Sequence, residues 1–210
     1  MQKGYEKTYD WVVKLLQDCN FEDAAKRLGL TQTAQDEVSV EFLGRVYRVN
    51  KNGVHLTEQN IVWTAKSEGF DYNLKSDLGY YVLSDANMEP INDFCTLSVF
   101  CGGVFREGGD GSVFGNALGR VYGRDYQRFC AVAEKLGMTL EESKPPLKYI
   151  WRYTMLPKLP IKIVYYEGDE EYPTKLQILY DKTAIQVYKF EPLAVLNGCF
   201  MEALAAIGEL

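Results

Sequence analysis

The sequence predicts an α+β fold in which helices pack on a mainly antiparallel sheet. Apolar residues recur at helical spacing near both ends of the chain, and they alternate with polar residues in strand fashion after residue 37. Hairpin signals recur, so strands and helices do not alternate strictly, which favours α+β over a parallel α/β fold. The 210 residues contain no repeat and no long linker, so we expect 1–210 to be a single domain.

Two helices are predicted at the start of the chain. The stripe that includes Tyr5, Tyr9 and Leu16 has the 3.6-residue period of an amphipathic helix. Asn20 is suited to cap a second, short helix, and Gly29 is suited to end it.

A meander of strands is expected next. In the run EVSVEF (37–42) apolar and polar residues alternate, which places one face on a core. Gly44 predicts a tight bend or bulge, and the pair Asn52-Gly53 predicts a hairpin turn.

The remaining elements follow from similar patterns. A helix around Leu74 is expected behind a cap at Asp71, and FCTLSVFC (94–101) is expected to be a buried strand. A long amphipathic helix is expected from Ser112 to Leu136, and the Pro145-Pro146 pair marks a break. The runs IKIVYYE and KLQILYD predict two paired strands, and Pro192 suits the first turn of a last helix.

Composition and charge exclude several classes of protein. The net charge is −6 and no long basic run occurs, so a nucleic-acid partner is not expected. The five cysteines are scattered, and no signal peptide or apolar stretch of about 20 residues is apparent. We therefore expect a soluble cytoplasmic protein with reduced thiols and no membrane partner.

The acidic run YYEGDEEYP (165–173) is the first candidate site. Gly168-Asp169 between two apolar runs indicates a solvated hairpin tip. A cation such as Mg²⁺ would alternatively accept Asp169 and Glu171, with further ligands from elsewhere, for example Asp110 or Asp181. Consecutive carboxylates on an extended chain point to opposite faces, so the run alone assigns no metal site.

The glycine-rich loop CGGVFREGGDGS (101–112) is the second candidate site. Gly109, Gly111 and Ser112 precede a predicted helix, where backbone N–H groups bind phosphate or carboxylate. The spacing is neither G-x-G-x-x-G nor a P-loop, so a connecting loop is the alternative.

Glycines also recur every fourth residue from Gly111 to Gly123. On a helix they would form a ridge that allows close packing or the approach of a flat ligand, and otherwise the segment is not a regular helix.

Other catalytic signatures are missing from the sequence. His55 is the one histidine, so a zinc site is not expected, and a Cys101–His55 pair would lack a third partner. The aromatic residues between 149 and 166 are interpreted as core, or alternatively as the lining of a ligand cleft.

Three blocks carry a resemblance to a known family. EFLGRVYRV (41–49), LPKLPIKIVYYEGDEEYP (156–173) and KLQILYD (175–181) resemble the recurrent blocks of the bacterial and archaeal family called Domain of Unknown Function 3786. Their order and spacing fit over most of the chain, and Tyr172 and Tyr180 stand where members usually have phenylalanine.

The resemblance implies no assigned activity. It associates the chain with anaerobes, and some relatives carry an iron–sulfur segment like those of corrinoid methyl-transfer proteins. The cysteine spacing for such a cluster is missing here. The resemblance therefore implies a contextual link to anaerobic one-carbon or corrinoid metabolism.

These observations favour a small-molecule-binding or accessory protein whose partner is a small-molecule ligand or another protein. The candidate ligand-binding residues are Gly109, Gly111, Ser112, Asp169 and Glu171, and the sequence assigns no catalytic residue, metal or cofactor. One alternative is a metal-dependent enzyme that uses the hairpin carboxylates, and another is a protein-interaction module.

Overall fold

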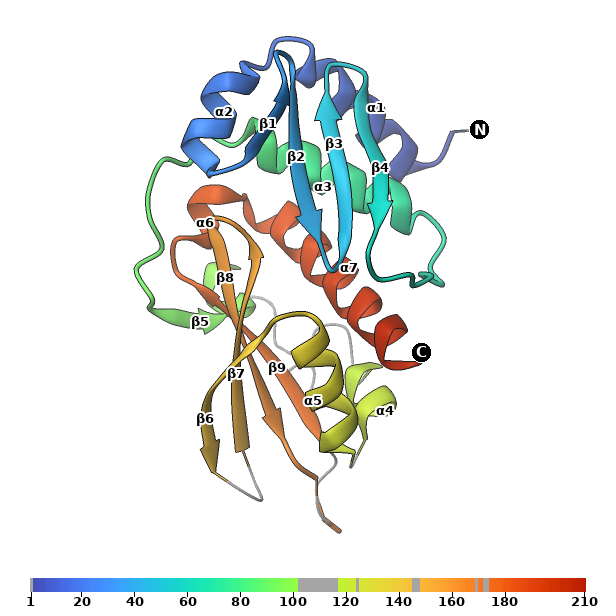
Figure 1. Ribbon diagram of the computed structural model, residues 1–210, viewed down its shortest axis with the longest axis vertical. Helices are drawn as coiled ribbons and strands as arrows, with labels where there is room; N and C mark the ends of the chain where they lie inside the picture. The colour runs from blue at the N-terminus through green and yellow to red at the C-terminus, as the bar shows by residue number, and fades with distance from the viewer. Residues whose placement is uncertain (1, 102–116, 124, 145–147, 169, 172–173) are drawn as a thin grey trace.

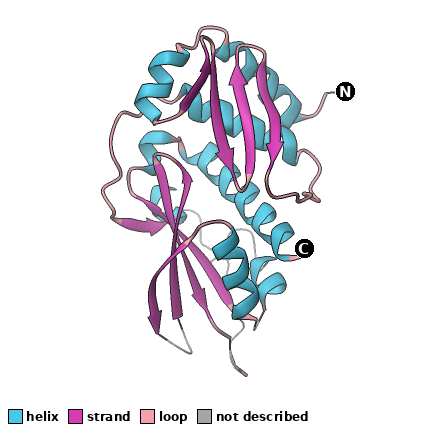
Figure 2. Ribbon diagram, viewed as in Figure 1, coloured by secondary structure: helices cyan, strands magenta, loops and turns pink. Residues whose placement is uncertain are grey.

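The computed structural model describes residues 2–101, 117–123, 125–144, 148–168, 170–171 and 174–210. Within these residues the chain forms two sheets in which every strand pair is antiparallel, and helices pack against both (Figure 1). The α+β prediction is therefore confirmed. Figure 2 shows that the strands gather in two groups, with helices behind and between them.

The first sheet has four strands in the order β1-β2-β3-β4 and the second has five in the order β5-β9-β8-β7-β6. The strands of the first sheet are β1 (Thr31–Ala34), β2 (Glu37–Phe42), β3 (Arg45–Asn50) and β4 (Gly53–Gln59). Those of the second are β5 (Phe94–Thr96), β6 (Thr139–Lys144), β7 (Lys148–Leu156), β8 (Leu159–Tyr166) and β9 (Lys175–Asp181). The helices are α1 (Gly4–Leu16), α2 (Phe21–Leu28), α3 (Phe70–Leu83), the 3-10 helix η1 (Leu97–Cys101), α4 (Ala117–Tyr122), α5 (Tyr126–Lys135), α6 (Ala184–Val187) and α7 (Phe190–Gly208).

The first sheet is a meander, as the sequence predicts. In β2, Val38, Val40 and Phe42 are buried while the intervening residues are not, so one face lies on the core. The bend at Gly44 is confirmed, because Leu43 and Gly44 have positive φ of 48° and 75° and connect β2 to β3. Helices α1 and α3 cover the buried face of this sheet (Figure 1).

The cap and stop of α2 are also confirmed. The Asn20 side chain accepts a hydrogen bond from the backbone N–H of Asp23 at 3.1 Å, and Gly29 ends the helix with φ of 68°. Both features depend only on residues within one helical turn.

Helix α7 lies between the two sheets and packs against α3, α4 and α5 (Figure 1). It begins at Phe190, two residues before Pro192, and its buried residues include Leu196, Phe200 and Leu204. By length and composition α7 is apolar enough to cross a membrane, so the expectation that no stretch approaches that length is wrong. Half of that stretch (50%) is buried inside the fold.

The hairpin between β3 and β4 turns one residue earlier than predicted. Asn50 pairs with Gly53, so the turn residues are Lys51 and Asn52 rather than Asn52 and Gly53. The Asn50 side chain accepts a hydrogen bond from the Asn52 backbone N–H at 2.8 Å, which stabilises this turn locally.

The predicted cap of α3 is wrong by two residues. Gly69, with φ of 82°, is the N-cap, and it makes no side-chain cap hydrogen bond. Asp71 lies in the first turn, where its carboxylate pairs with Lys75 at 2.7 Å. An acidic residue in the first turn is stabilised by the helix dipole without being the cap.

The run 94–101 is not one buried strand. Only Phe94–Thr96 pair with β9, at the edge of the second sheet, and these three residues are half-buried. The chain then forms η1, in which the Cys101 thiol donates to the Ser98 carbonyl at 3.1 Å. Because β5 is the edge strand of the second sheet, β9 is its one neighbouring strand among the described residues. The residues after Thr96 leave β9 and therefore have no described strand to pair with.

The single long helix predicted from Ser112 to Leu136 is wrong in the described part. Helix α4 ends at Gly123, whose positive φ of 44° stops a right-handed helix. Asp125 then caps α5 by accepting from the Arg128 backbone N–H at 2.9 Å. Of the glycine ridge, Gly119 lies in α4, whereas Gly111 and Gly115 lie outside the described residues.

Candidate functional site

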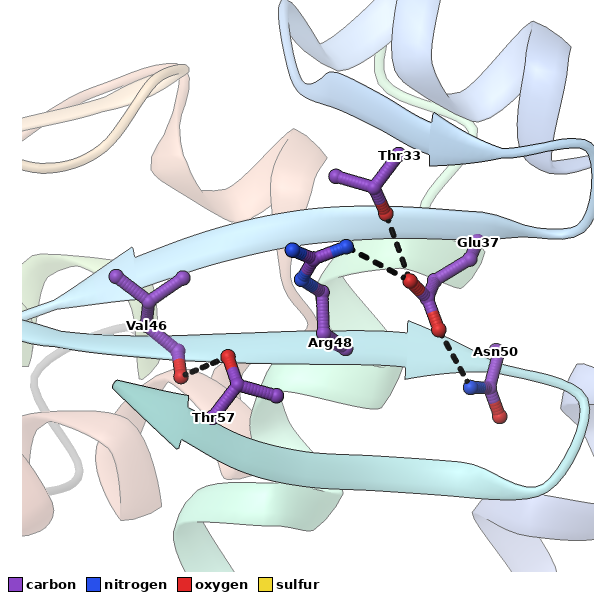
Figure 3. Close-up of polar contacts among 6 residues, drawn as sticks. All are labelled: Thr33, Glu37, Val46, Arg48, Asn50 and Thr57. Atoms are coloured by element: carbon purple, nitrogen blue, oxygen red, sulfur yellow. Dashed lines mark hydrogen bonds and ion pairs between the residues drawn. The ribbon is translucent and has the colours of Figure 1, made fainter.

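The outer face of the first sheet carries the polar residues of the strand alternation. At one end Glu37 accepts hydrogen bonds from Thr33 Oγ1 at 2.8 Å, Arg48 Nη1 at 2.9 Å and Asn50 Nδ2 at 2.9 Å (Figure 3). The hydrogen bonds from Asn50 and then Thr33 hold the pKa of Glu37 below its ordinary value. The hydrogen bonds from these three side chains therefore already occupy the Glu37 carboxylate.

The other end of this face is hollowed. A cavity of about 380 Å³ is bounded by the end of α2, by the outward residues Ser39, Glu41 and Val46, and by the end of β7. A second cavity of about 280 Å³ adjoins it beside Lys135. Both cavities are lined by Glu41, Leu136 and Tyr153, and together they form one hollow between the two sheets. We call this hollow the interlayer groove.

Tyr153 is the aromatic contribution of the second sheet to the groove. Its ring packs against Phe200 of α7 with 6.0 Å between centroids, and its hydroxyl has a backbone hydrogen bond with Leu43. Burial, and then the negative charge of Glu41, raises the pKa of Tyr153 to about 12. The hydroxyl therefore stays protonated near neutral pH, in a fixed position from which it can donate or accept.

Two opposite charges face the smaller cavity. Glu41 comes from β2, and Lys135 is the last residue of α5. Within the described part of the chain, neither has an ion-pair partner. The groove thus offers an anionic acceptor, a cationic donor and a neutral hydroxyl to one bound molecule.

The residues predicted from the glycine-rich loop and the acidic run lie elsewhere. Gly109, Gly111, Ser112 and Asp169 lie outside the described residues, so their roles stay predictions. Glu171 is exposed and lines neither cavity of the groove. The end of β8 at Tyr166 pairs with Lys148, so it lies at the opposite end of the strand from the hairpin that joins Leu156 to Leu159.

Asp181, proposed as a further metal ligand, has an internal role. Its buried carboxylate accepts hydrogen bonds from the backbone N–H groups of Ile91, Asn92 and Thr183 and from the Thr183 hydroxyl. Among the described residues, no cluster of three or more His, Cys, Asp or Glu side chains is placed to hold a metal ion.

The cysteines and the histidine do not form a site in the described structure. All five cysteines are free, as the sequence predicts. His55 is exposed on the edge strand β4, and Cys101 lies in η1 beside the second sheet.

The aromatic run divides between the core and the groove. Tyr149 stacks on Tyr126 of α5 at 3.6 Å between centroids, and Trp151 Nε1 donates to the Tyr126 hydroxyl at 3.2 Å. Tyr165 of β8 also packs against α5. Tyr153, two residues after Trp151 in β7, lines the groove instead.

Sequence reasoning missed Glu41 and Lys135. The one signal for Glu41 was its place at a polar position of the alternating run EVSVEF. Lys135 follows the pattern of a cation in the last turn of a helix, which is common without any ligand.

Comparison with known proteins identifies a family. The family model described as "Domain of unknown function (DUF3786)" matches residues 20–203, and the chain therefore belongs to this family. No curated protein and no solved structure matches the chain.

Proposed function

We propose that this member of the DUF3786 family binds a small polar molecule in the interlayer groove. The observation that carries the proposal is the pair of adjoining cavities, which share Glu41, Leu136 and Tyr153. Small-molecule sites are concave and combine apolar walls with a few placed polar groups.

The charges on the wall favour a zwitterion as the ligand. Glu41 would accept from an amine and Lys135 would donate to a carboxylate, while the Tyr153 hydroxyl orients a further polar group. Leu136 and Met155 supply apolar contact area. A molecule of the size of an amino acid, with one charge of each sign, matches this arrangement.

Thermal unfolding of the whole chain with each of the standard amino acids as probes tests the proposal. A ligand at about 100 times its Kd stabilises the folded state by about 2.7 kcal/mol, which is readily measured. Glu41→Gln and Lys135→Met should each lower the affinity for the amino acid about tenfold, because each removes one charged contact, and the thermal stabilisation should fall accordingly.

Glu58→Gln is the matched control, because Glu58 is exposed on β4 and lines neither cavity. It should leave the response unchanged. If no amino acid stabilises the wild-type chain, or if neither groove variant weakens the response relative to the wild type, binding of a zwitterion in the groove is contradicted.

The other roles expected from the sequence stay proposals. A metal-dependent activity at Asp169 and Glu171 rests on the sequence of the acidic run, and the corrinoid link rests on the family resemblance. A titration with Mg²⁺ tests the metal-dependent activity. A titration with cobalamin, followed by the cobalamin absorption bands, tests the corrinoid link. A cytoplasmic location is proposed from the five free cysteines.

A further inference from the structure

Arg45 is a buried cation on the opposite face of the first sheet from the interlayer groove. It is the first residue of β3 and its exposed fraction is 8%. Arginine is almost never buried to this degree unless it is paired, because removing its charge from water is costly. The surroundings of Arg45 therefore have to compensate for that charge.

The protein compensates for the charge only in part. The guanidinium stacks on the ring of Trp63, 3.4 Å from its centroid, and Nη2 donates to the Trp63 carbonyl. Trp63 is itself held by a hydrogen bond from Nε1 to the Leu43 carbonyl at 3.1 Å. In the part of the chain that the structure describes, Arg45 has no carboxylate partner and its Nε has no hydrogen-bond partner.

A second buried polar atom lies on the same face of β3. The side chain of Tyr47, two residues after Arg45, is fully buried, and its hydroxyl lies beside the Arg45 side chain, which opposes the rise in the Tyr47 pKa that burial causes. Among the described residues the unpaired atom at this place is therefore Arg45 Nε, and buried polar atoms without a partner are uncommon in folded proteins.

Arg45 lines a cavity of about 340 Å³ at the start of α3. Trp63, Phe70 and Tyr72 give this cavity aromatic walls. The N-cap of α3, Gly69, has no side chain to accept from the first-turn N–H groups; the Phe70 N–H donates to the Ser67 carbonyl at 3.3 Å, and the next N–H groups face the end of the helix. A buried guanidinium and a helix N-terminus without a side-chain cap both favour an anion in this space.

The other charge on the cavity wall restricts the anion. Asp71 also lines the cavity, and its carboxylate pairs with Lys75 at 2.7 Å. Arg45, Asp71 and Lys75 together carry a net charge of one positive unit. This charge suits a monoanion better than a phosphate dianion. A carboxylate matches the planar donors of arginine, and a flat apolar group matches the aromatic walls.

The loop that forms one wall is held in place by α7. Glu202 accepts hydrogen bonds from the backbone N–H groups of Lys66 and Ser67 at 2.6 and 2.7 Å, and Lys66 pairs with Glu209 at 2.6 Å. A wall that is already ordered loses less entropy when a ligand binds.

We infer that this cavity binds the carboxylate of a small aromatic or apolar acid, with Arg45 as the residue that contacts the carboxylate. The inference is independent of the groove, because Arg45 and Glu41 belong to different cavities.

Benzoate, titrated into the whole chain at constant ionic strength, is the probe for this inference. Saturable binding is expected by calorimetry, with shifts of the backbone amide NMR signals of residues 64–72. Benzamide has the same ring without the charge, so it should bind at least about tenfold more weakly. Inorganic phosphate should also bind more weakly because of Asp71.

Three variants locate the site. Arg45→Met should reduce the affinity for benzoate at least about tenfold. Arg48→Met is the matched control, since Arg48 lies in the same strand on the outer face and should leave benzoate binding unchanged. Asp71→Asn removes the negative charge from the wall and should strengthen binding, and this result remains informative if Arg45→Met does not fold.

The inference is overturned if benzoate does not bind the wild-type chain, if benzamide binds equally well, or if Asp71→Asn leaves the affinity unchanged. Glu41→Gln should not alter benzoate binding, so failure of this site and failure of the groove are distinguishable.

Discussion

Replacing Asp181 with asparagine should destabilise the fold strongly without changing the size of the side chain. Asp181 is fully buried, and its carboxylate accepts from Ile91 N at 3.3 Å, Asn92 N at 2.5 Å, Thr183 N at 3.0 Å and Thr183 Oγ1 at 2.7 Å. These bonds tie the segment before β5 and the start of α6 to the end of β9.

The magnitude follows from these contacts. A hydrogen bond to a charged group contributes about 1.5–3 kcal/mol. In Asp181→Asn one oxygen becomes an NH₂ donor that faces other donors, so about two of the four bonds are lost and the remainder weaken. We expect a loss of about 3–5 kcal/mol from a total stability of about 5–15 kcal/mol.

Urea unfolding at pH 7 measures the effect, with Asp93→Asn as the control. Asp93 pairs with Lys182 at 2.6 Å, but its side chain is 55% exposed, and exposed pairs contribute at most about 1 kcal/mol. If Asp181→Asn costs no more than Asp93→Asn, the assigned role of Asp181 is refuted.

The dependence on pH provides a second check. Burial alone would raise the pKa of Asp181, but the hydrogen bonds from Thr183, Ile91 and Asn92 outweigh it and hold the pKa below its ordinary value. A lowered folded-state pKa means that the contribution is fully present above the unfolded pKa of about 3.9 and is lost as pH falls through the folded value. The stability difference between wild type and Asp181→Asn should therefore shrink below about pH 3.9.

Two further substitutions test packing. Gly53 has a φ of 121°, and an added Cβ would lie 2.5 Å from the Tyr9 hydroxyl. Gly53→Ala should therefore cost about 2–3 kcal/mol and lower the Tm by several degrees. An unchanged Tm would contradict this close approach. Tyr180→Phe removes the buried hydrogen bond from the Tyr180 hydroxyl to Asn197 Oδ1 at 2.7 Å and should cost about 1–2 kcal/mol in urea unfolding, whereas an unchanged midpoint would show that the bond adds nothing.

Much of the local structure could be predicted from the sequence. The alternation in β2, the Asn20 cap and the Gly29 stop depend on residues within a few positions of one another. Such features are set by backbone geometry and local hydrogen bonding, which are encoded in short runs.

Other elements depended on contacts across the fold. The strand pair β6 and β7 was not predicted, because the aromatic run 148–156 has no turn signal of the Asn-Gly kind and becomes a strand by pairing with β8. The break at Gly123 was missed because Gly123 is the last of four glycines at regular spacing, and only the φ of 44° identifies it as the end of α4.

The sequence by itself determined the α+β class, the meander of the first sheet, the pairing of β8 with β9 and the family of the chain. Only the tertiary structure decided which polar residues meet. Glu41 and Lys135 face one cavity because the end of α5 lies beside the first sheet, and Arg45 is buried because the segment around Trp63 packs over it. Propensity acts over a few residues, whereas the burial of a charge depends on what the rest of the chain places around it.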